Sequence, residues 1–138
     1  MISLIIGKKG SGKTKHLVEL VNADVDSSMG NVVCIEKGLK LTYDLTHKAR
    51  LVDSDEFGID NYDALYGFIA GMCAGNYDLT DIFVDATLRI GGRDYDKFAD
   101  FVEKLSKLCT VASAKITFTV SCDENELPAK VFDFAQKI

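Results

Sequence analysis

The feature that most constrains this chain is a glycine-rich segment between an apolar stretch and an amphipathic one. Residues 7–14 read GKKGSGKT and match the pattern G-x-x-x-x-G-K-[ST] at every fixed position. The preceding residues, 2–6, form a nearly continuous apolar run, which is typical of a strand buried on both faces. In residues 13–26 apolar side chains recur at helical spacing. The sequence therefore predicts a strand, a tight loop and a helix in direct succession.

The residue types in this loop suit the binding of a chain of phosphate groups. Glycines let the backbone adopt positive φ angles and come close to a ligand, and we expect this at Gly7, Gly10 and Gly12. Successive N–H groups then converge on the anion, and the positive end of the following helix strengthens the attraction. Lys13 would reach the β- and γ-phosphates, and the Thr14 hydroxyl would ligate magnesium. The predicted nucleotide-binding residues are Gly7, Lys8, Lys9, Gly10, Ser11, Gly12, Lys13 and Thr14.

Strand-like and helix-like segments alternate along the rest of the chain. Short apolar runs predict further strands at residues 32–35, 49–53, 82–84 and 116–120. Helical periodicity predicts helices at residues 62–75, at 98–108, and from about Pro128 onward. This alternation favours parallel strands joined by right-handed crossovers. We expect one domain over residues 1–138 with an α/β fold, a three-layer αβα sandwich whose mostly parallel sheet has four or five strands.

Charge and composition narrow the class of partner. The 138-residue chain is 47% hydrophobic and 27% charged, as in an ordinary globular domain. Its formal net charge of −5 provides no overall positive field to hold a nucleic acid backbone or an anionic membrane surface. Met1 runs directly into an apolar strand without a basic leader, and no apolar run approaches the ~20 residues that span a bilayer. We therefore expect neither nucleic acid nor membrane as the main partner.

The four cysteines are far apart in the sequence and contain no C-x-x-C pair. Cys34, Cys73, Cys109 and Cys122 each lie in or beside an apolar segment. This pattern indicates buried, reduced thiols rather than zinc ligands. Reduced thiols are typical of the cytoplasm, which is the expected location.

With these motifs the sequence resembles the P-loop NTPases. Residues 7–14 correspond to the Walker A motif of that superfamily, and IFVD at residues 82–85 resembles its Walker B strand. The resemblance implies that Asp85 holds the magnesium ion together with Thr14, from the strand beside the P-loop strand. It also implies ATP or another nucleoside triphosphate as the ligand and Mg²⁺ as the cofactor.

Within this superfamily the sequence is closest in pattern to RecA-like and KaiC-like ATPases. Many P-loop ATPases place a glutamate directly after the Walker B aspartate, but here that residue is Ala86. RecA-like and KaiC-like proteins instead carry a glutamate at the end of the strand that follows the P-loop helix, and Glu36 has this position. Residues 85–89, DATLR, also resemble their segment after Walker B. The resemblance makes Glu36 the candidate general base, beside Lys13 and Asp85, and Ser121 a candidate γ-phosphate sensor.

Two further segments contain candidate residues. Arg89 and Arg93 flank Gly91 and Gly92 in an expected exposed loop just past Asp85, and either would neutralise γ-phosphate charge in its own chain or in a neighbouring subunit. Residues 37–60 follow the second strand at the edge where ligands bind in open α/β sheets. There Asp53 or Asp55 would read a substrate hydroxyl and Tyr43 would stack on a base, or the segment is simply a solvated acidic loop.

Three functions remain open at this stage. The first is a small RecA-like ATPase or nucleotide switch with slow turnover, acting as a homo-oligomer or with a protein partner. The second is a nucleotide-binding module without catalysis. Ala86 favours this function, because it stands where many P-loop ATPases have a glutamate. The third is a phosphotransferase, because the first strand, the P-loop and the second strand also resemble the start of thymidine kinases. No [NT]-K-x-D element typical of GTPases is present, which favours ATP.

Overall fold

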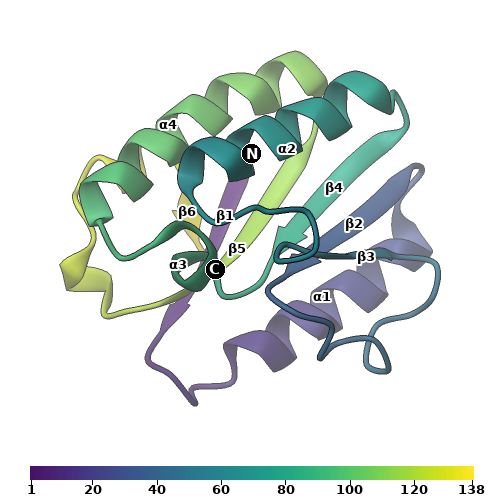
Figure 1. Ribbon diagram of the computed structural model, residues 1–138, viewed down its shortest axis with the longest axis horizontal. Coiled ribbons are helices and arrows are strands. Elements are labelled where there is room, and N and C mark those ends of the chain that lie inside the picture. The colour runs from purple at the N-terminus through teal and green to yellow at the C-terminus, as the bar shows by residue number, and fades with distance from the viewer.

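The computed structural model describes residues 1–138 and shows three layers (Figure 1). A single sheet forms the middle layer. Helices α2 (Tyr62–Gly75) and α4 (Tyr95–Ala112) cover one of its faces, and α1 (Lys13–Ser27) covers the other. The predicted αβα sandwich is therefore confirmed.

Six strands make up the sheet, in the order β3-β2-β4-β5-β1-β6, and every neighbouring pair is parallel. Their bounds are β1 (Ile2–Gly7), β2 (Asn31–Glu36), β3 (Arg50–Asp53), β4 (Leu79–Val84), β5 (Lys115–Ser121) and β6 (Gln136–Lys137). Because all the strands run the same way, the ends of β1, β2, β4 and β5 meet at one edge of the sheet. The expectation that the strand before Asp85 lies beside the P-loop strand is wrong, because β5 lies between β4 and β1.

The expected strand count and the expected last helix both needed correction at the C-terminus. The segment after β5 contains a short 3-10 turn, η1 (Glu124–Glu126), and a four-residue helix, α5 (Val131–Phe134), instead of one longer helix. The chain then forms β6, whose two exposed residues pair with β1. This pairing covers an edge of the sheet that would otherwise be open. Two polar residues leave no apolar pattern, which is why β6 was not expected.

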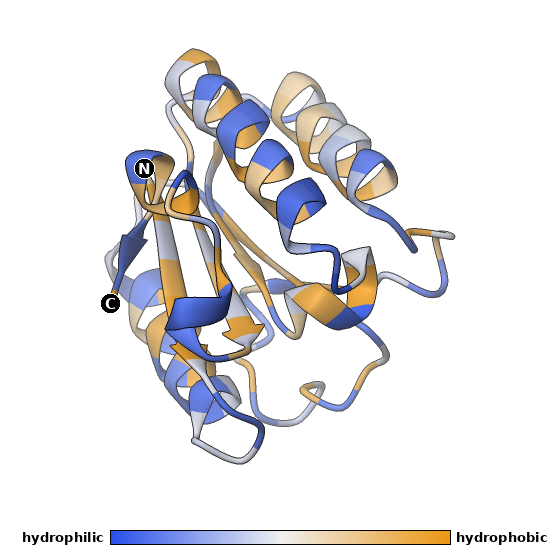
Figure 2. Ribbon diagram, turned by 90° about the vertical axis from the view of Figure 1, so that its left-hand side faces the viewer, coloured by the Kyte–Doolittle hydropathy of each residue, from blue (hydrophilic) through white to orange (hydrophobic).

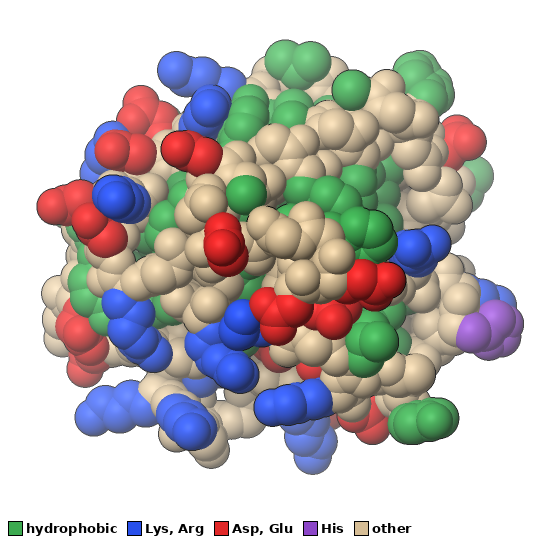
Figure 3. Space-filling view, in the orientation of Figure 1, with side chains coloured by type: hydrophobic (Ala, Val, Ile, Leu, Met, Phe, Trp, Pro, Cys, Tyr) green, Lys and Arg blue, Asp and Glu red, His purple; other side chains and the backbone are tan.

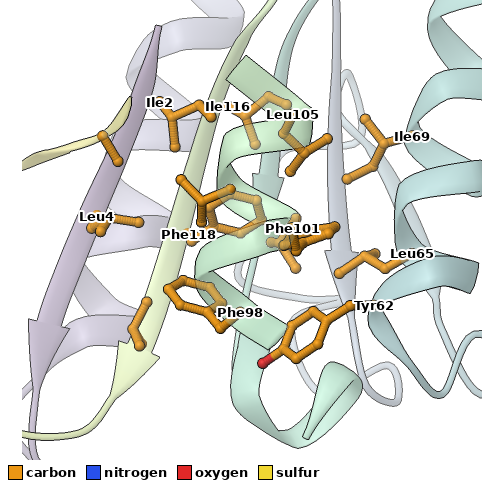
Figure 4. Close-up of a cluster of buried hydrophobic side chains, with 14 of the residues drawn as sticks. Ile2, Leu4, Tyr62, Leu65, Ile69, Phe98, Phe101, Leu105, Ile116 and Phe118 are labelled. Carbon is orange, nitrogen blue, oxygen red and sulfur yellow. The ribbon is translucent and has the colours of Figure 1, made fainter. Parts of the chain in front are cut away.

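Apolar side chains fill the spaces on both sides of the sheet. Figure 2 shows the strands as largely hydrophobic, with hydrophilic residues on the outer surfaces of the helices. On the α2–α4 side, Phe98 and Phe101 pack against Tyr62 and Phe118, with ring centroids 5.0 to 6.5 Å apart (Figure 4). A smaller cluster, which includes Leu17, lies on the α1 side. This packing holds the strand ends in fixed relative positions.

The cysteines are unpaired, as the sequence predicted. All four are free thiols. Cys34, Cys109 and Cys122 are buried, whereas Cys73 is half-buried. None of the helices combines the length and the apolar character needed to cross a membrane.

Candidate functional site

The strand ends open into a cavity of about 840 Å³. It is bordered by the loop between β1 and α1, by the ends of β2, β4 and β5, and by α3 (Thr87–Gly91). Ten of the predicted site residues line it, namely Lys9, Gly10, Gly12, Lys13, Thr14, Glu36, Asp85, Arg89, Arg93 and Ser121. Six lining residues were not predicted, namely Lys15, Lys37, Lys40, Leu41, Ala86 and Thr119. Residues far apart in the sequence thus share one cavity.

The loop between β1 and α1 depends on its glycines for two different reasons. Gly10 and Gly12 have φ angles of +84° and +89°, a region that L-residues with side chains rarely occupy. Gly7 does not share this positive φ, contrary to our expectation. A Cβ at Gly7 would instead lie 2.5 Å from Ser11 Oγ, so a side chain there would force the Ser11 side chain to move.

The N-terminus of α1 is left open, unlike those of the other long helices. Asn61 caps α2 by accepting a hydrogen bond from Ala64 N, and Asp94 caps α4 in the same manner. At α1 the N-cap residue is Gly12, no side chain caps the helix, and no acidic residue lies in its first turn. The free N–H groups and the positive end of the helix dipole therefore remain available for an external anion.

Lys13 folds back over this loop. Its ammonium donates hydrogen bonds to Lys8 O at 2.8 Å and to Ser11 Oγ at 3.4 Å, and the residue is only 9% exposed. Burial lowers the pKa of Lys13, while the negative charge of Asp85 acts in the opposite direction. The ammonium is thus held at the loop by neutral oxygen atoms, which phosphate oxygens can replace.

Asp85 and Thr14 come together across the cavity floor. The Thr14 hydroxyl lies 3.2 Å from each carboxylate oxygen of Asp85, and Asp85 is 7% exposed. Hydroxyl and carboxylate oxygens are the hard donors that Mg²⁺ prefers, so this pair fits a magnesium ion. No group of three or more His, Cys, Asp or Glu side chains could hold a metal alone. Magnesium bound together with nucleotide phosphates needs only one or two protein ligands, because it keeps several waters.

Glu36 lies at the end of β2 and is almost fully buried, at 4% exposed. Its Oε1 accepts a hydrogen bond from Lys40 N at 3.0 Å, and its Oε2 accepts one from Leu41 N at 3.1 Å. Burial raises the pKa of the carboxyl, and these two hydrogen bonds act against that rise. Glu36 therefore anchors the loop after β2 while it faces the same cavity as Lys13.

The comparisons with known proteins concern the fold. No protein-family model matches the sequence, and no curated protein matches it either. Among solved structures, the chain is similar to the flagellar accessory protein FlaH from Methanocaldococcus jannaschii, with a TM-score of 0.57 and 13% identity over 96% of this chain. It is also similar to the pCW3 conjugation coupling protein TcpA, in its monomer form with ATPγS, with a TM-score of 0.53 and 15% identity over 96% of this chain.

The chain has the fold of a P-loop NTPase. It spans 65% of the FlaH chain and 46% of the TcpA chain, so each of those proteins contains a substantial part with no counterpart here. Residues 7–14, predicted from the sequence as the P-loop and called so below, border the cavity, which lies at the edge of the sheet where β1 ends.

Three polar side chains line the P-loop cavity on its β4–β5 side. We expected Arg89 to lie in a loop, but it lies on α3 and is exposed there. Arg93 follows that helix and donates a hydrogen bond from Nη1 to Ser121 O at 3.1 Å. Ser121, half-buried at the end of β5, lines the cavity beside it. The Arg93 side chain is thus tied to its own chain, whereas the Arg89 side chain forms no hydrogen bond or ion pair.

The substrate-reading residues predicted in the 37–60 segment do not line the cavity. Tyr43 is 97% exposed. Asp53 accepts hydrogen bonds from Gly38 N and Asp55 N, and Asp55 pairs with Lys37 at 2.6 Å. These carboxylates therefore stabilise the loop itself.

The charge around the cavity contrasts with that of the whole chain. Figure 3 shows Lys and Arg side chains gathered in the lower part of this face, where Figure 1 places the P-loop. Two carboxylates line the cavity, those of Glu36 and Asp85, against seven cations, namely Lys9, Lys13, Lys15, Lys37, Lys40, Arg89 and Arg93. Only Lys37 among these cations forms an ion pair. An acidic chain has thus concentrated unpaired positive charge at one place.

Proposed function

We propose that this chain binds ATP with magnesium in the P-loop cavity and hydrolyses it slowly, as a RecA-like ATPase or nucleotide switch. The observation that carries this proposal is the convergence, in one cavity, of the uncapped α1 N-terminus, Lys13 and the Thr14–Asp85 pair. Each of these groups suits one part of a magnesium nucleotide. The N–H groups and Lys13 suit the phosphates, and the oxygen pair suits the metal.

The unpaired cations support a polyanionic ligand. A nucleoside triphosphate carries about four negative charges near neutral pH, and magnesium reduces this to about two. Seven cations facing two carboxylates would otherwise repel one another across the cavity. Binding of the nucleotide would relieve that repulsion, so affinity should fall as salt screens it.

Glu36 is the residue that we assign to water activation. A carboxylate oxygen has two lone pairs, so the single N–H bond that each oxygen accepts leaves one lone pair free for a water molecule. A raised pKa brings a carboxylate closer to the range in which general bases are effective. Magnesium, when bound, would supply charge stabilisation at the phosphates.

A second candidate is a nucleotide-binding module without turnover. It is favoured by two observations. Ala86 follows Asp85 where many P-loop ATPases have a glutamate, and each oxygen of Glu36 already accepts one N–H bond from the loop after β2. In that case the bound nucleotide would act only as a signal to a protein partner or a second copy of the chain.

ATP is the proposed nucleotide, and the cytoplasm is the proposed location. TcpA was determined with ATPγS, and no guanine-reading element is present in this sequence. The four free thiols suit a reducing compartment in which magnesium and ATP are plentiful.

Single-turnover hydrolysis separates the two candidates. With protein in excess over radiolabelled ATP and with magnesium present, the wild type should convert all bound ATP, and Lys13→Ala should convert none. If the wild type binds ATP but converts it no faster than Lys13→Ala does, the chain is a binding module and the hydrolysis proposal is wrong.

A further inference from the structure

Thr119 is a buried polar residue in the middle layer that the sequence analysis did not single out. It lies on β5, the strand between the P-loop strand and the strand that leads to Asp85, and it is 1% exposed. Its hydroxyl donates a hydrogen bond to Asp85 Oδ1 at 2.7 Å. The same hydroxyl accepts one from Ala86 N, also at 2.7 Å. A single buried hydroxyl thus contacts two consecutive residues of the site.

The direction of these bonds follows from chemistry alone. A hydroxyl has one proton and two lone pairs, whereas a backbone N–H can only donate. Because Ala86 N donates to Thr119 Oγ1, the Thr119 proton is free to point at the Asp85 carboxylate. Asp85 Oδ1 is therefore held by the strand framework, and not only by the Thr14 hydroxyl at 3.2 Å.

The bond to Ala86 holds a strained part of the backbone. Ala86 has φ +52° and ψ +50°, the left-handed region that costs a residue with a side chain about 1 kcal/mol or more. This residue turns the chain from the end of β4 into α3, which carries Arg89. Thr119 Oγ1 is the side-chain partner of Ala86 N in this turn.

We propose that Thr119 is a positioning residue that aims the Asp85 carboxylate at the magnesium of the bound nucleotide. The inference rests on the proposed function, since it concerns the same site. Thr119 itself does not touch the nucleotide in this scheme. It orients the Asp85 carboxylate and supports the turn at Ala86. Loss of its hydroxyl should therefore weaken the affinity for magnesium more than the affinity for the nucleotide without magnesium.

Three variants isolate the hydroxyl. Thr119→Val keeps the shape of the side chain but can neither donate to Asp85 nor accept from Ala86. Thr119→Ser keeps the hydroxyl. Thr117→Val makes the same chemical change two residues earlier, on the same face of β5, where the threonine side chain forms no hydrogen bond.

The experiment is a magnesium titration of fluorescent-ATP binding by the purified chain, repeated with metal chelated by EDTA. Thr119→Val should raise the magnesium concentration for half-maximal enhancement of binding by about 10-fold or more, because the residue that orients a metal ligand contributes this much to metal affinity. Its affinity for the nucleotide in EDTA should stay within about threefold of wild type. Thr119→Ser and Thr117→Val should keep the wild-type magnesium requirement.

Two results would overturn the inference. One is a wild-type magnesium requirement in Thr119→Val, and the other is a shift that Thr119→Ser shares in full. If Thr119→Val does not fold, Thr119→Ala compared with Thr119→Ser gives the same test, because these two differ only in the hydroxyl. Lys13→Ala run in parallel separates the two failures. Nucleotide binding that survives Lys13→Ala contradicts the proposed nucleotide site itself, whereas loss of binding in Lys13→Ala together with a wild-type magnesium requirement in Thr119→Val contradicts only the role of Thr119.

Discussion

Replacement of Glu36 by glutamine tests both roles that the structure gives this residue. In the wild type the two carboxylate oxygens accept N–H bonds from Lys40 and Leu41. A glutamine has only one acceptor oxygen, so one of these N–H groups would face an NH₂ group. Losing a buried hydrogen bond to a charged group costs about 1 to 3 kcal/mol, and the free energy of unfolding should fall by that amount. With ~5–15 kcal/mol of total stability typical of such a domain, the variant should remain folded.

The same substitution removes the proposed general base. We expect the single-turnover rate for magnesium-ATP to fall by about 10²-fold or more, because an amide cannot accept a proton from water. The affinity for ATP should change by only a few-fold, because Lys13 and the α1 N-terminus are unaltered. Rapid-quench hydrolysis and urea unfolding of the same preparation measure the two effects separately.

A matched control separates loss of the base from loosening of the loop. Gly38 lies in the loop that Glu36 anchors and has a φ angle of +100°, so Gly38→Ala should strain this loop by roughly 1 kcal/mol while the carboxylate stays intact. It should lower stability but keep most of the turnover. Wild-type turnover in Glu36→Gln would refute the assignment of the base. An equal loss of turnover in Gly38→Ala would show that the loop, rather than proton transfer, is responsible.

Three further predictions concern the packing of Phe98, the pKa of Asp24 and the role of Arg93. Phe98→Ala, at a fully buried ring, should lower the free energy of unfolding by about 3–5 kcal/mol in urea, and a loss below ~1 kcal/mol would contradict the packing described. Burial and the neighbouring Asp81 raise the pKa of Asp24 to about 6, above its value in the unfolded chain, so its stabilising contribution is present at low pH and is lost as pH rises through 6. The stability of Asp24→Asn relative to wild type should therefore grow by on the order of 1–2 kcal/mol between pH 4 and pH 7, and a difference independent of pH would argue against a shifted carboxyl. Arg93 is tied to Ser121 O in its own chain, so specific ATPase activity should not depend on protein concentration, and Arg93→Ala should reduce that activity. Specific activity that rises with protein concentration would instead indicate an arginine supplied by another subunit.

The parts of the fold that the sequence predicted are those with strong local patterns. The strand before the P-loop and the helices around Leu17, Ile69 and Phe98 show clear apolar periodicity, and all are present. The missed elements lack such a pattern. Strand β6 is two polar residues that pair with an existing edge, and α3 is a five-residue helix set by the left-handed turn at Ala86. Strand β6 depends on its pairing with β1, and the turn before α3 is bonded through Ala86 N to Thr119 on β5, so the local sequence predicts neither element.

The candidate site divides in the same way. The P-loop could be predicted because its spacing is a local property, and Asp85 and Glu36 because each ends an apolar strand. Lys40 could not be predicted, since its place depends on how the loop after β2 folds back to Glu36. Thr119 did carry a signal, because it lies two residues before Ser121 on the same strand face, but its partner is 34 residues away and appears only when β4 and β5 pair.

Calorimetric titration of the purified chain with ATP, with and without magnesium, tests the central claim most directly. Wild type should bind one ATP per chain more tightly with magnesium than without it, and Lys13→Ala should reduce the affinity by at least about 10-fold. Asp85→Asn should bind ATP in EDTA as wild type does but gain little from magnesium. Absence of ATP binding by the wild type, or equal binding by Lys13→Ala, would contradict the account of this cavity as a nucleotide site.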